Sequence, residues 1–409
     1  MSRSEWVQAT LADCVDTINS GVSVNSDDRP RGPGEIGVLK TSAVGAGSFD
    51  PDENKVVAKR DRSRVAEPVL GGSVLFSRMN TPRLVGESCY VEAGDPSLFL
   101  PDRLWQIRVD SSRADARWFS YALLESRAAS EIKRLATGTS GSMKNIAKSG
   151  FLGICILTPP IEEQRRIAEI LAALDGQIRA SESVTEKLVT IHTATLDDLL
   201  DDLPKESYVR LKHHLLVPPK NGYSPVAAHE STGEYMLGLG CLTVRGFVPR
   251  QLKHAPVGDV RLQPFQLGDG DVLISRSNTR DLVGLAGVFR DVGAPCYYPD
   301  LMMRLVPSGT VSNTYLAAVL NTQRVRRQIT NVASGTSGSM VKITKSTVET
   351  LTLPIPSRSE QDRIEAATRA ATEALDSELN RLEKLRFLKA GLIDDLLTGR
   401  VRLADEAAS

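Results

Sequence analysis

Pro101-Asp102, followed by Glu131 and Lys133, imitates the arrangement of a metal-dependent nuclease. In such a site two carboxylates hold Mg²⁺ and a lysine supports the attacking water. A later stretch of the chain keeps the first half of this pattern as Pro299-Asp300, but an amide and a hydroxyl stand at the positions of Glu131 and Lys133. We therefore interpret Pro-Asp as a turn before a strand at 104–109, and we expect no catalytic residue and no metal site in this chain.

Two segments carry the residue types that suit DNA reading. They are Ser77-Arg78-Met79-Asn80-Thr81 and Ser275-Arg276-Ser277-Asn278-Thr279-Arg280, and each follows a short apolar alternation that predicts a strand. Arginine can bond guanine edges and asparagine adenine edges, although both residues also occur at strand ends simply as turn residues. Polar loops elsewhere add further candidates. The residues that we predict to contact DNA are Lys40, Thr41, Ser77, Arg78, Asn80, Thr81, Lys220, Asn221, Ser275, Arg276, Asn278, Thr279 and Arg280.

Sequence motifs for other chemistries are missing. An adenine methyltransferase needs a Gly-rich cofactor loop and an (Asp/Asn)-Pro-Pro-(Tyr/Phe) motif, and the Pro-Pro pairs at 159–160 and 218–219 have neither flanking residue type. No Gly-Lys-Ser/Thr loop for ATP is present. The five cysteines lie far apart without a CxxC pair, so we expect buried free thiols. The chain is predicted to hold no cofactor.

An internal repeat organises the chain. The six residues Gly-Thr-Ser-Gly-Ser-Met at 138–143 recur at 335–340, an offset of 197 that holds without a gap to the Asp-Asp-Leu-Leu segments at 197–200 and 394–397. Further upstream the offset changes by one, and Leu84-Val85-Gly86 matches Leu282-Val283-Gly284. Towards their starts the two copies differ, as readers of two different targets would have to. The repeated Gly/Ser segment is typical of a turn; alternatively, its backbone N–H groups would meet a phosphate.

Each copy contains a β-rich part and a long helix. Short apolar alternations between Gly, Pro, Asn and Asp predict strands, with brief helical stretches at 118–133 and 315–329. After Pro159-Pro160, leucine and isoleucine recur at near-heptad spacing to 202, and a similar run spans 359–398. Each helix would be about 60 Å long at a rise of about 1.5 Å per residue. The two helices would bury their apolar stripes on each other, or polar seam positions would admit a partner helix.

These patterns predict an α+β protein with two tandem α/β domains, each followed by a long α-helix, the two helices pairing as an antiparallel coiled coil. The predicted limits are 1–158 for the first domain, 159–203 for the first helix, 204–356 for the second domain and 357–409 for the second helix with its tail. Net charge is zero overall, but these segments carry +1, −6, +7 and −2. A basic domain beside acidic helices is typical of a phosphate-facing domain on a protein-facing scaffold.

Composition excludes several other classes of protein. Aromatic residues make up only 5% of the chain, which disfavours stacking on single strands and favours a duplex target. No apolar run approaches the roughly 18 to 20 residues that span a bilayer. The first residues lack the charged and apolar regions of a secretion signal. We therefore expect a cytoplasmic protein with no membrane partner.

The order of these motifs resembles the specificity subunits of Type I restriction-modification systems. The Gly-Thr-Ser-Gly-Ser-Met segment, an apolar strand, and Thr158-Pro159-Pro160-Ile161-Glu162-Glu163-Gln164-Arg165-Arg166-Ile167 at the helix start carry the resemblance. The second copy repeats it with Leu353-Pro354-Ile355-Pro356 and Glu360-Gln361, although Ser357-Arg358 replaces a proline and an apolar residue. The resemblance implies two target-recognition domains that read a bipartite duplex target, with the long helices as spacers.

The resemblance also implies the partners. These would be double-stranded DNA, adenine-N6 methyltransferase subunits, expected as two per complex, and an ATP-driven restriction subunit in systems that also cut. S-adenosylmethionine, ATP and Mg²⁺ would be bound by those subunits and not by this chain. Two alternatives stay open from the sequence: a specificity subunit of a methylation-only system, and a coiled-coil scaffold that does not bind DNA. The scaffold predicts no salt-sensitive DNA binding.

Overall fold

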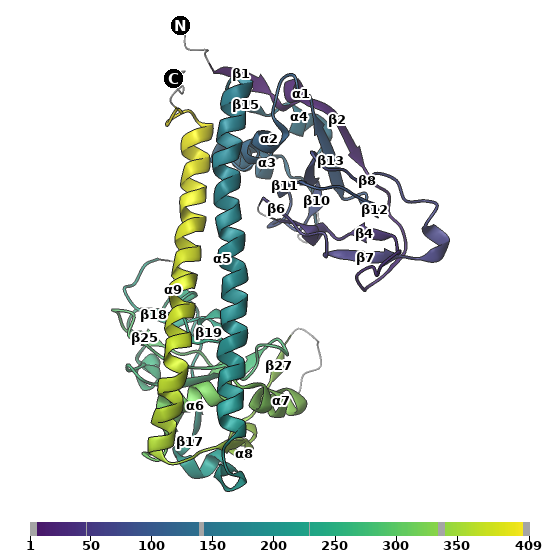
Figure 1. The fold of residues 1–409 in the computed structure, drawn as a ribbon. Coiled ribbons are helices and arrows are strands. Elements are labelled where there is room, and N and C mark those ends of the chain that lie inside the picture. Colours follow the sequence, from purple (N-terminus) through teal and green to yellow (C-terminus); the bar gives the residue numbers. More distant parts are fainter. Residues whose placement is uncertain (1–5, 46, 139–142, 229, 334–339, 404–409) are drawn as a thin grey trace, which may run out of the picture. The chain divides into compact units, whose positions relative to one another are not determined.

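The computed structural model describes residues 6–45, 47–138, 143–228, 230–333 and 340–403. Backbone contacts divide the chain into two units, Met1–Glu182 with Asn380–Ser409, and Ser183–Leu379. Two long helices, α5 (Ile161–Asp201) and α9 (Arg358–Leu397), are each shared between the units (Figure 1). Unit 1 holds the first part of α5 and the last part of α9, and unit 2 holds the other parts.

Unit 1 is built on two sheets. A four-stranded antiparallel sheet has the order β11-β9-β13-β2, and a five-stranded sheet has the order β3-β7-β4-β12-β8 with β12 and β4 parallel. The strands of the first sheet are β2 (Val15–Ser20), β9 (Val74–Ser77), β11 (Ser88–Tyr90) and β13 (Leu104–Val109). Those of the second are β3 (Ser26–Asp27), β4 (Gly37–Leu39), β7 (Asn54–Val57), β8 (Pro68–Val69) and β12 (Asp95–Phe99).

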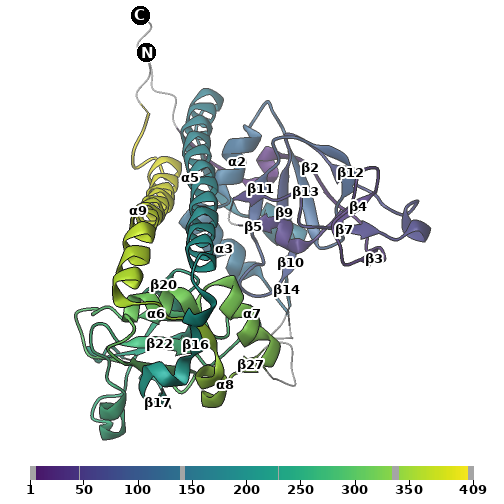
Figure 2. The same ribbon diagram turned by 60° about the horizontal axis from the view of Figure 1, so that its bottom comes forward.

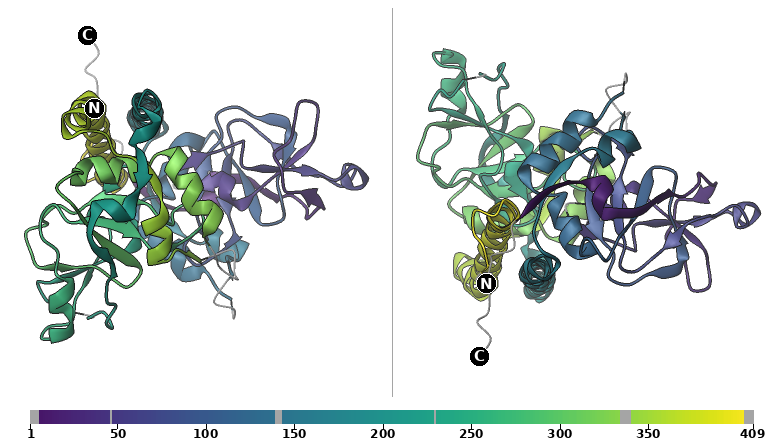
Figure 3. Two further views of the ribbon diagram at one scale, coloured as in Figure 1. Left: turned by 90° about the horizontal axis from the view of Figure 1, so that it is seen from below. Right: turned by 90° about the horizontal axis from the view of Figure 1, so that it is seen from above.

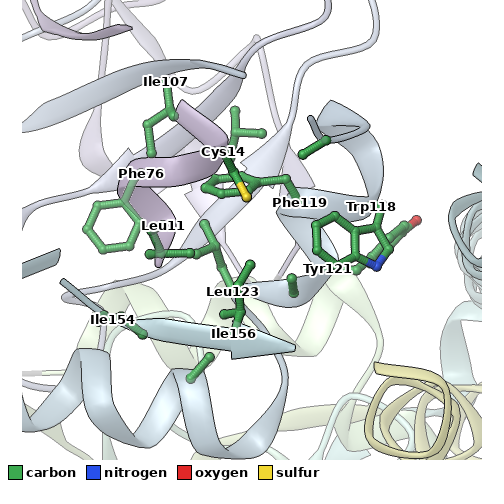
Figure 4. Close-up of a cluster of buried hydrophobic side chains, with 14 of the residues drawn as sticks. Leu11, Cys14, Phe76, Ile107, Trp118, Phe119, Tyr121, Leu123, Ile154 and Ile156 are labelled. Carbon is green, nitrogen blue, oxygen red and sulfur yellow. The ribbon is translucent and has the colours of Figure 1, made fainter. Parts of the chain in front are cut away.

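Short strand pairs and helices complete unit 1. The pairs are β1 (Val7–Thr10) with β15 (Cys155–Thr158), β5 (Val44–Gly45) with β6 (Ser48–Phe49), and β10 (Met79–Asn80) with β14 (Lys144–Asn145). The helices are α1 (Leu11–Cys14), α2 (Ala116–Ala122), α3 (Ser126–Leu135) and α4 (Lys148–Leu152). Figure 4 shows Phe76 and Ile107 of the sheet meeting Trp118 and Phe119 of α2 in one buried apolar cluster. The sheet and the helices thus share a core.

Unit 2 repeats this architecture (Figure 2). Its four-stranded antiparallel sheet β17-β26-β22-β24 contains β17 (Leu215–Asn221), β22 (Val272–Ser275), β24 (Ala286–Val288) and β26 (Met302–Pro307). The second sheet contains β18 (Tyr235–Leu237), β21 (Leu252–His254) and β25 (Cys296–Tyr297). Short pairs are β16 (Tyr208–Arg210) with β28 (Thr352–Pro354), β19 (Leu242–Thr243) with β20 (Gly246–Phe247), and β23 (Ser277–Asn278) with β27 (Val341–Lys342). The helices are α6 (Asn313–Leu320), α7 (Gln323–Val332) and α8 (Lys345–Thr350).

Packing explains why the Leu-Val-Gly segments repeat. Gly86 and Gly284 have φ angles of +86° and +78°, a region that favours glycine. A Cβ atom at Gly86 would lie 2.4 Å from Ile132 Cγ2, and one at Gly284 would lie 2.6 Å from Ile329 Cγ2. Ile132 belongs to α3, and Ile329 belongs to the corresponding helix α7. Glycine is therefore required in both copies, because the chain turns directly beneath that helix.

The brief helical stretches predicted at 118–133 and 315–329 are each two helices. The chain leaves α2 at Leu123, and the Glu125 side chain accepts hydrogen bonds from the backbone N–H groups of Arg127 and Ala128 at the start of α3. In unit 2 the corresponding break lies between α6 and α7 at Asn321 and Thr322. Periodicity alone could not show these breaks, because a capping acid or threonine also fits a helix interior.

The long helices pair in opposite directions, as predicted. In unit 1, Leu174 and Ile178 of α5 form a buried cluster with Leu382 of α9. Ion pairs join Asp175 to Lys389 and Glu182 to Arg386, both at 2.6 Å, so the residue numbers rise along one helix and fall along the other. Figure 3 views the two helices nearly end-on. The antiparallel coiled coil is confirmed.

The two long helices begin in the same way. Each long helix begins just after a proline whose carbonyl accepts a hydrogen bond from a buried glutamine, Gln164 to Pro159 at 2.8 Å and Gln361 to Pro356 at 2.9 Å.

Four cysteines are buried as predicted, but the prediction is wrong for Cys155, which is exposed. Strand β15 alternates exposed and buried residues, and Cys155 lies on its exposed face. Within the described ranges no helix is long and apolar enough to cross a membrane.

Candidate nucleic-acid interface

The Ser-Arg-x-Asn-Thr segments form the corner at the end of a central strand in each unit. Strand β9 ends at Ser77, and Asn80 is only 6% exposed. The Asn80 amide Nδ2 donates to Ser77 Oγ at 3.1 Å, and its Oδ1 accepts from the backbone N–H of Thr81 at 2.9 Å. These contacts shape the corner and leave little of Asn80 exposed to a ligand. In unit 2, Asn278 Oδ1 accepts from Thr279 N at the same distance of 2.9 Å.

Arginine occupies the same place in both corners. A backbone hydrogen bond holds each arginine in place. The carbonyl of Arg78 accepts a hydrogen bond from the backbone N–H of Ile146 at 2.9 Å, and the carbonyl of Arg276 accepts one from that of Ile343 at 3.0 Å. The Arg78 guanidinium lies 5.7 Å from the centre of the Trp105 ring, and its Nε has no hydrogen-bond partner among the described residues. Arg276 Nη1 donates to the carbonyl of Asp300 at 3.3 Å. A half-buried guanidinium that has no carboxylate partner within the described ranges is suited to bind guanine or phosphate.

Strand pairing brings a second repeated motif to this corner. β10 pairs with β14, placing Asn80 opposite Lys144, and β23 pairs with β27, placing Ser277 opposite Lys342. Lys144 Nζ donates to the carbonyl of Gly138 at 2.8 Å, and Lys342 is exposed. The repeated Gly/Ser segment therefore leads directly into strands beside the arginines. Its residues 139–142 and 335–339 lie outside those that the structure describes, so the predicted turn is not described there.

The sequence did not indicate Lys144 and Lys342. Each lies within two residues of the repeated methionine, at Met143 and Met340, but at different positions. The offset of the repeat therefore does not align the two lysines, and only the strand pairing shows that both reach the arginine corner.

Two other predicted residues, Lys220 and Asn221, lie close to the arginine corner of unit 2. Lys220 and Asn221 are at the end of β17, where Asn221 pairs with Met303, one residue from Met302, which pairs with Ser275. They thus share the end of the sheet with the arginine corner. Lys220 Nζ lies 4.8 Å from the centre of the Phe265 ring.

Lys40 and Thr41 follow β4 in the other sheet of unit 1. Lys40 Nζ lies 3.7 Å from Glu53 Oε2, so its charge is partly neutralised. Arg280 is exposed in unit 2, and its Nη2 donates to the carbonyl of Thr330 at 3.2 Å. Ser77 and Ser275 are fully buried. The contact of these residues with DNA stays a prediction, and exposure favours Arg280 and Lys220 over the two serines.

The nuclease-like residues have other partners. Lys133 Nζ donates to the backbone carbonyls of Arg83 and Val85 at 2.9 and 2.6 Å, and Glu87 lies 3.5 Å away. Asp102 is exposed in the turn before β13, whose Leu104 N donates to the Pro101 carbonyl at 3.4 Å. The Lys133 side chain therefore supports the turn that ends at Gly86. Within the described ranges no three His, Cys, Asp or Glu side chains are grouped so that they could hold a metal ion.

The fold and these corners define a class of protein: two tandem α/β domains, each with an arginine at a strand end, joined to a pair of antiparallel helices. A solved structure with this fold is the S subunit of a Type-I restriction-modification system from M. genitalium, with a TM-score of 0.53, 15% identity, and 96% of each chain covered. Residues 3–189 match the family model of the Type I restriction modification DNA specificity domain.

Two curated relatives agree with this class. The type I restriction enzyme EcoEI specificity subunit of Escherichia coli is 25% identical over 163 residues, which are 40% of this chain and 27% of that subunit. A protein of Methanocaldococcus jannaschii named for the type I restriction enzyme MjaX specificity subunit is 21% identical over 98% of this chain and 94% of its own length. The resemblance seen in the sequence motifs is confirmed: this chain is similar to the specificity subunits of Type I restriction-modification systems, components that are not themselves catalytic.

Proposed function

We propose that this chain reads a bipartite sequence in duplex DNA and positions an adenine-N6 methyltransferase partner on it. Each unit would read one half of the target, and the long helices would set the gap between the halves. The observation that carries the proposal is the duplicated corner, in which Arg78 and Arg276 have the same backbone contacts in domains whose loops otherwise differ.

Arginine at these corners suits direct reading of a base pair. Its two nitrogens can bond O6 and N7 of guanine in the major groove, and such a bidentate contact contributes about 1 to 3 kcal/mol of discrimination. Lys144 in unit 1 and Lys342 in unit 2 would contact phosphates beside the arginine, which fixes position without reading sequence. Two domains that read separate base pairs would give a target of two specified blocks.

The chemistry would belong to partner subunits. Two methyltransferase subunits would bind S-adenosylmethionine and flip one adenine in each half-site, and a restriction subunit would use ATP and Mg²⁺. The names of the relatives, which are specificity subunits of restriction enzymes, support this division of labour. As a reader of cellular DNA, the protein would act in the cytoplasm.

Selection from a pool of random duplexes with the purified chain tests the proposal. We expect two enriched blocks separated by a gap of constant length and free sequence. Arg78→Ala should relax one block and Arg276→Ala the other, because each domain reads its own half. Thermal unfolding of each variant would check that its fold is retained. Absence of any enriched sequence, as a scaffold would give, contradicts the proposal, as does relaxation of the same block in both variants.

A further inference from the structure

A buried polar contact fills the space between α2, α5 and α9 in unit 1. Tyr121 Oη donates to Asp175 Oδ2 at 2.6 Å, and Lys389 Nζ lies 2.6 Å from Asp175 Oδ1. The Asp175 and Lys389 side chains are only 15% and 14% exposed. Gly47 of the β5–β6 hairpin closes the space, since a Cβ atom there would lie 3.3 Å from Lys389 Nζ. A phenol ring and a carboxylate thus occupy this position of the first repeat.

The equivalent space in unit 2 is a cavity. The offset of 197 places Ala318 where Tyr121 stands, Thr372 where Asp175 stands and His192 where Lys389 stands. Arg245, in the β19–β20 hairpin, takes the position of Gly47. These four residues line a cavity of about 520 Å³. That volume lies within the range of about 300 to 1,000 Å³ that is usual for small-molecule sites. In the second repeat, therefore, a ring and a carboxylate are missing and a guanidinium is added.

Arg245 is a largely buried cation whose ion-pair partner is mostly exposed. Its side chain is 16% exposed, and its ion-pair partner in the described part of the chain is Asp376 at 3.6 Å, a carboxylate that is itself 62% exposed. Burial lowers the pKa of Arg245, and the charge of Arg250 lowers it further. The charge of Asp376 opposes this decrease only in part. Burial likewise lowers the pKa of His192, so its imidazole is neutral at neutral pH and can donate one hydrogen bond.

The rest of the wall is apolar on one side and carries a carboxylate at the other end. Leu196, Phe247 and Ala317 give it an apolar side next to Ala318. Glu365 lies at the other end, with one buried carboxylate oxygen that has no partner among the described residues. Since Glu365 and Asp376 are eleven residues apart on α9, the two ends of the cavity are about 16 Å apart. Arg290, Arg369 and Glu373 of the wall are exposed to solvent, so the largely buried guanidinium of Arg245 is the charge that would attract an anionic group into the cavity.

We propose that this cavity is a binding site for a small aromatic carboxylate. The ring of the ligand would occupy the space that Tyr121 fills in unit 1, against Phe247 and Ala318. Its carboxylate would take the place of Asp175, accepting hydrogen bonds from Arg245 and His192. The site lies within unit 2, is separate from the arginine corner, and does not depend on the proposed function.

Calorimetric titration of the full chain with 4-hydroxybenzoate, at neutral pH, tests the site. We expect one ligand per chain, bound about tenfold or more tightly than benzyl alcohol, which lacks the charge, or acetate, which lacks the ring. Ala318→Tyr should abolish binding, because it restores the side chain that fills this space in unit 1. Arg245→Gln should weaken binding about tenfold or more, since it removes the buried cation. Arg261→Gln, at an exposed arginine outside the wall, is the matched control and should change binding less than about twofold.

Thermal unfolding of each variant separates loss of binding from loss of fold. Ala318→Tyr is the decisive variant because it adds to the packing, so the folded variant should no longer respond to the ligand while the wild type is stabilised by it. Absence of saturable binding to the wild-type chain would overturn the proposal. Binding that survives Ala318→Tyr, or that is equally strong for acetate, would overturn it as well.

Discussion

Gln164 and Gln361 connect the same two elements in the two units. The Gln164 Oε1 accepts a hydrogen bond from the backbone N–H of Asp115 at 2.8 Å, and the Gln361 Oε1 accepts one from that of Ser312 at 2.9 Å. Asp115 and Ser312 are the N-cap residues of α2 and α6. The repeated Glu-Gln pair therefore fixes the start of each long helix to the first helix of the domain before it.

Replacing either glutamine by leucine should destabilise its unit. The change leaves a buried backbone N–H and two carbonyls without their partner, which costs about 1 to 3 kcal/mol for an unsatisfied group. We expect Gln164→Leu and Gln361→Leu to lower the free energy of unfolding in urea by at least the cost of one such group. Gln177→Leu makes the same change at an exposed position of α5 and is the control. Equal unfolding midpoints for Gln164→Leu and the control would refute the role of the glutamine.

Thiol reactivity should distinguish Cys155 from the other four cysteines. Cys155 is exposed, whereas burial raises the pKa of Cys14 to about 11 and the pKa values of Cys89 and Cys296 to about 12. Because the thiolate is the reactive form, buried thiols with such pKa values should not react at pH 8. We expect an aromatic disulfide reagent to label one thiol in the native chain and all five in denaturant. Rapid labelling that persists in Cys155→Ser would contradict this assignment.

Arg276 and Arg280 should contribute to the salt dependence of DNA binding. Removing one phosphate contact reduces the slope of log K against log salt by about 0.9. We expect Arg276→Ala with Arg280→Ala to weaken binding and to reduce the slope by about 1 to 2. The control is Arg261→Ala with Arg290→Ala, which removes two arginines already paired with Asp259 and Asp269. Identical slopes for both double variants would count against DNA contacts by Arg276 and Arg280.

Purified alone, the chain should neither cut nor methylate DNA. With Mg²⁺ present, we expect duplex DNA to stay intact, because Lys133 is engaged with the carbonyls of Arg83 and Val85 and not with a water site. With S-adenosylmethionine present, we expect no methyl transfer, since the motif that holds a flipped adenine is missing. Gel analysis and methyl incorporation measure the two reactions. Metal-dependent cleavage that disappears in Asp102→Asn or Lys133→Ala would show that the turn is an active site.

The internal repeat made most of the fold predictable. A motif that occurs twice at a constant offset, such as the Gly-Thr-Ser-Gly-Ser-Met segment, must fit the same structure twice, and heptad spacing indicated the paired helices. The direction of side chains at the corners was not predictable. Ser77 and Asn80 suit base edges by residue type, yet both are buried, because the corner needs hydrogen bonds that only short polar side chains supply. Long-range pairing, such as that of β10 with β14, leaves no local signal in the sequence.

The role of the helices as a ruler can be tested at the boundary between the two units, which falls within each helix. Four helix-favouring residues inserted after Glu182 in α5, and four after Leu379 in α9, lengthen both helices by about 6 Å and keep their pairing. One base pair of B-DNA occupies about 3.4 Å, so the gap between half-sites should lengthen by one or two base pairs. The half-sequences should stay the same, because neither corner is changed.

Sequencing of methylated adenines in a host that carries the methyltransferase partner tests the central claim most directly. With the wild-type chain we expect methylation at one bipartite sequence with a constant gap, and without the chain we expect that methylation to disappear. With the lengthened helices we expect the same two half-sequences at the longer gap. Methylation that is unchanged without the chain would contradict its role as the specificity component. Altered half-sequences at an unchanged gap would contradict the assignment of the domains as readers and the helices as spacers.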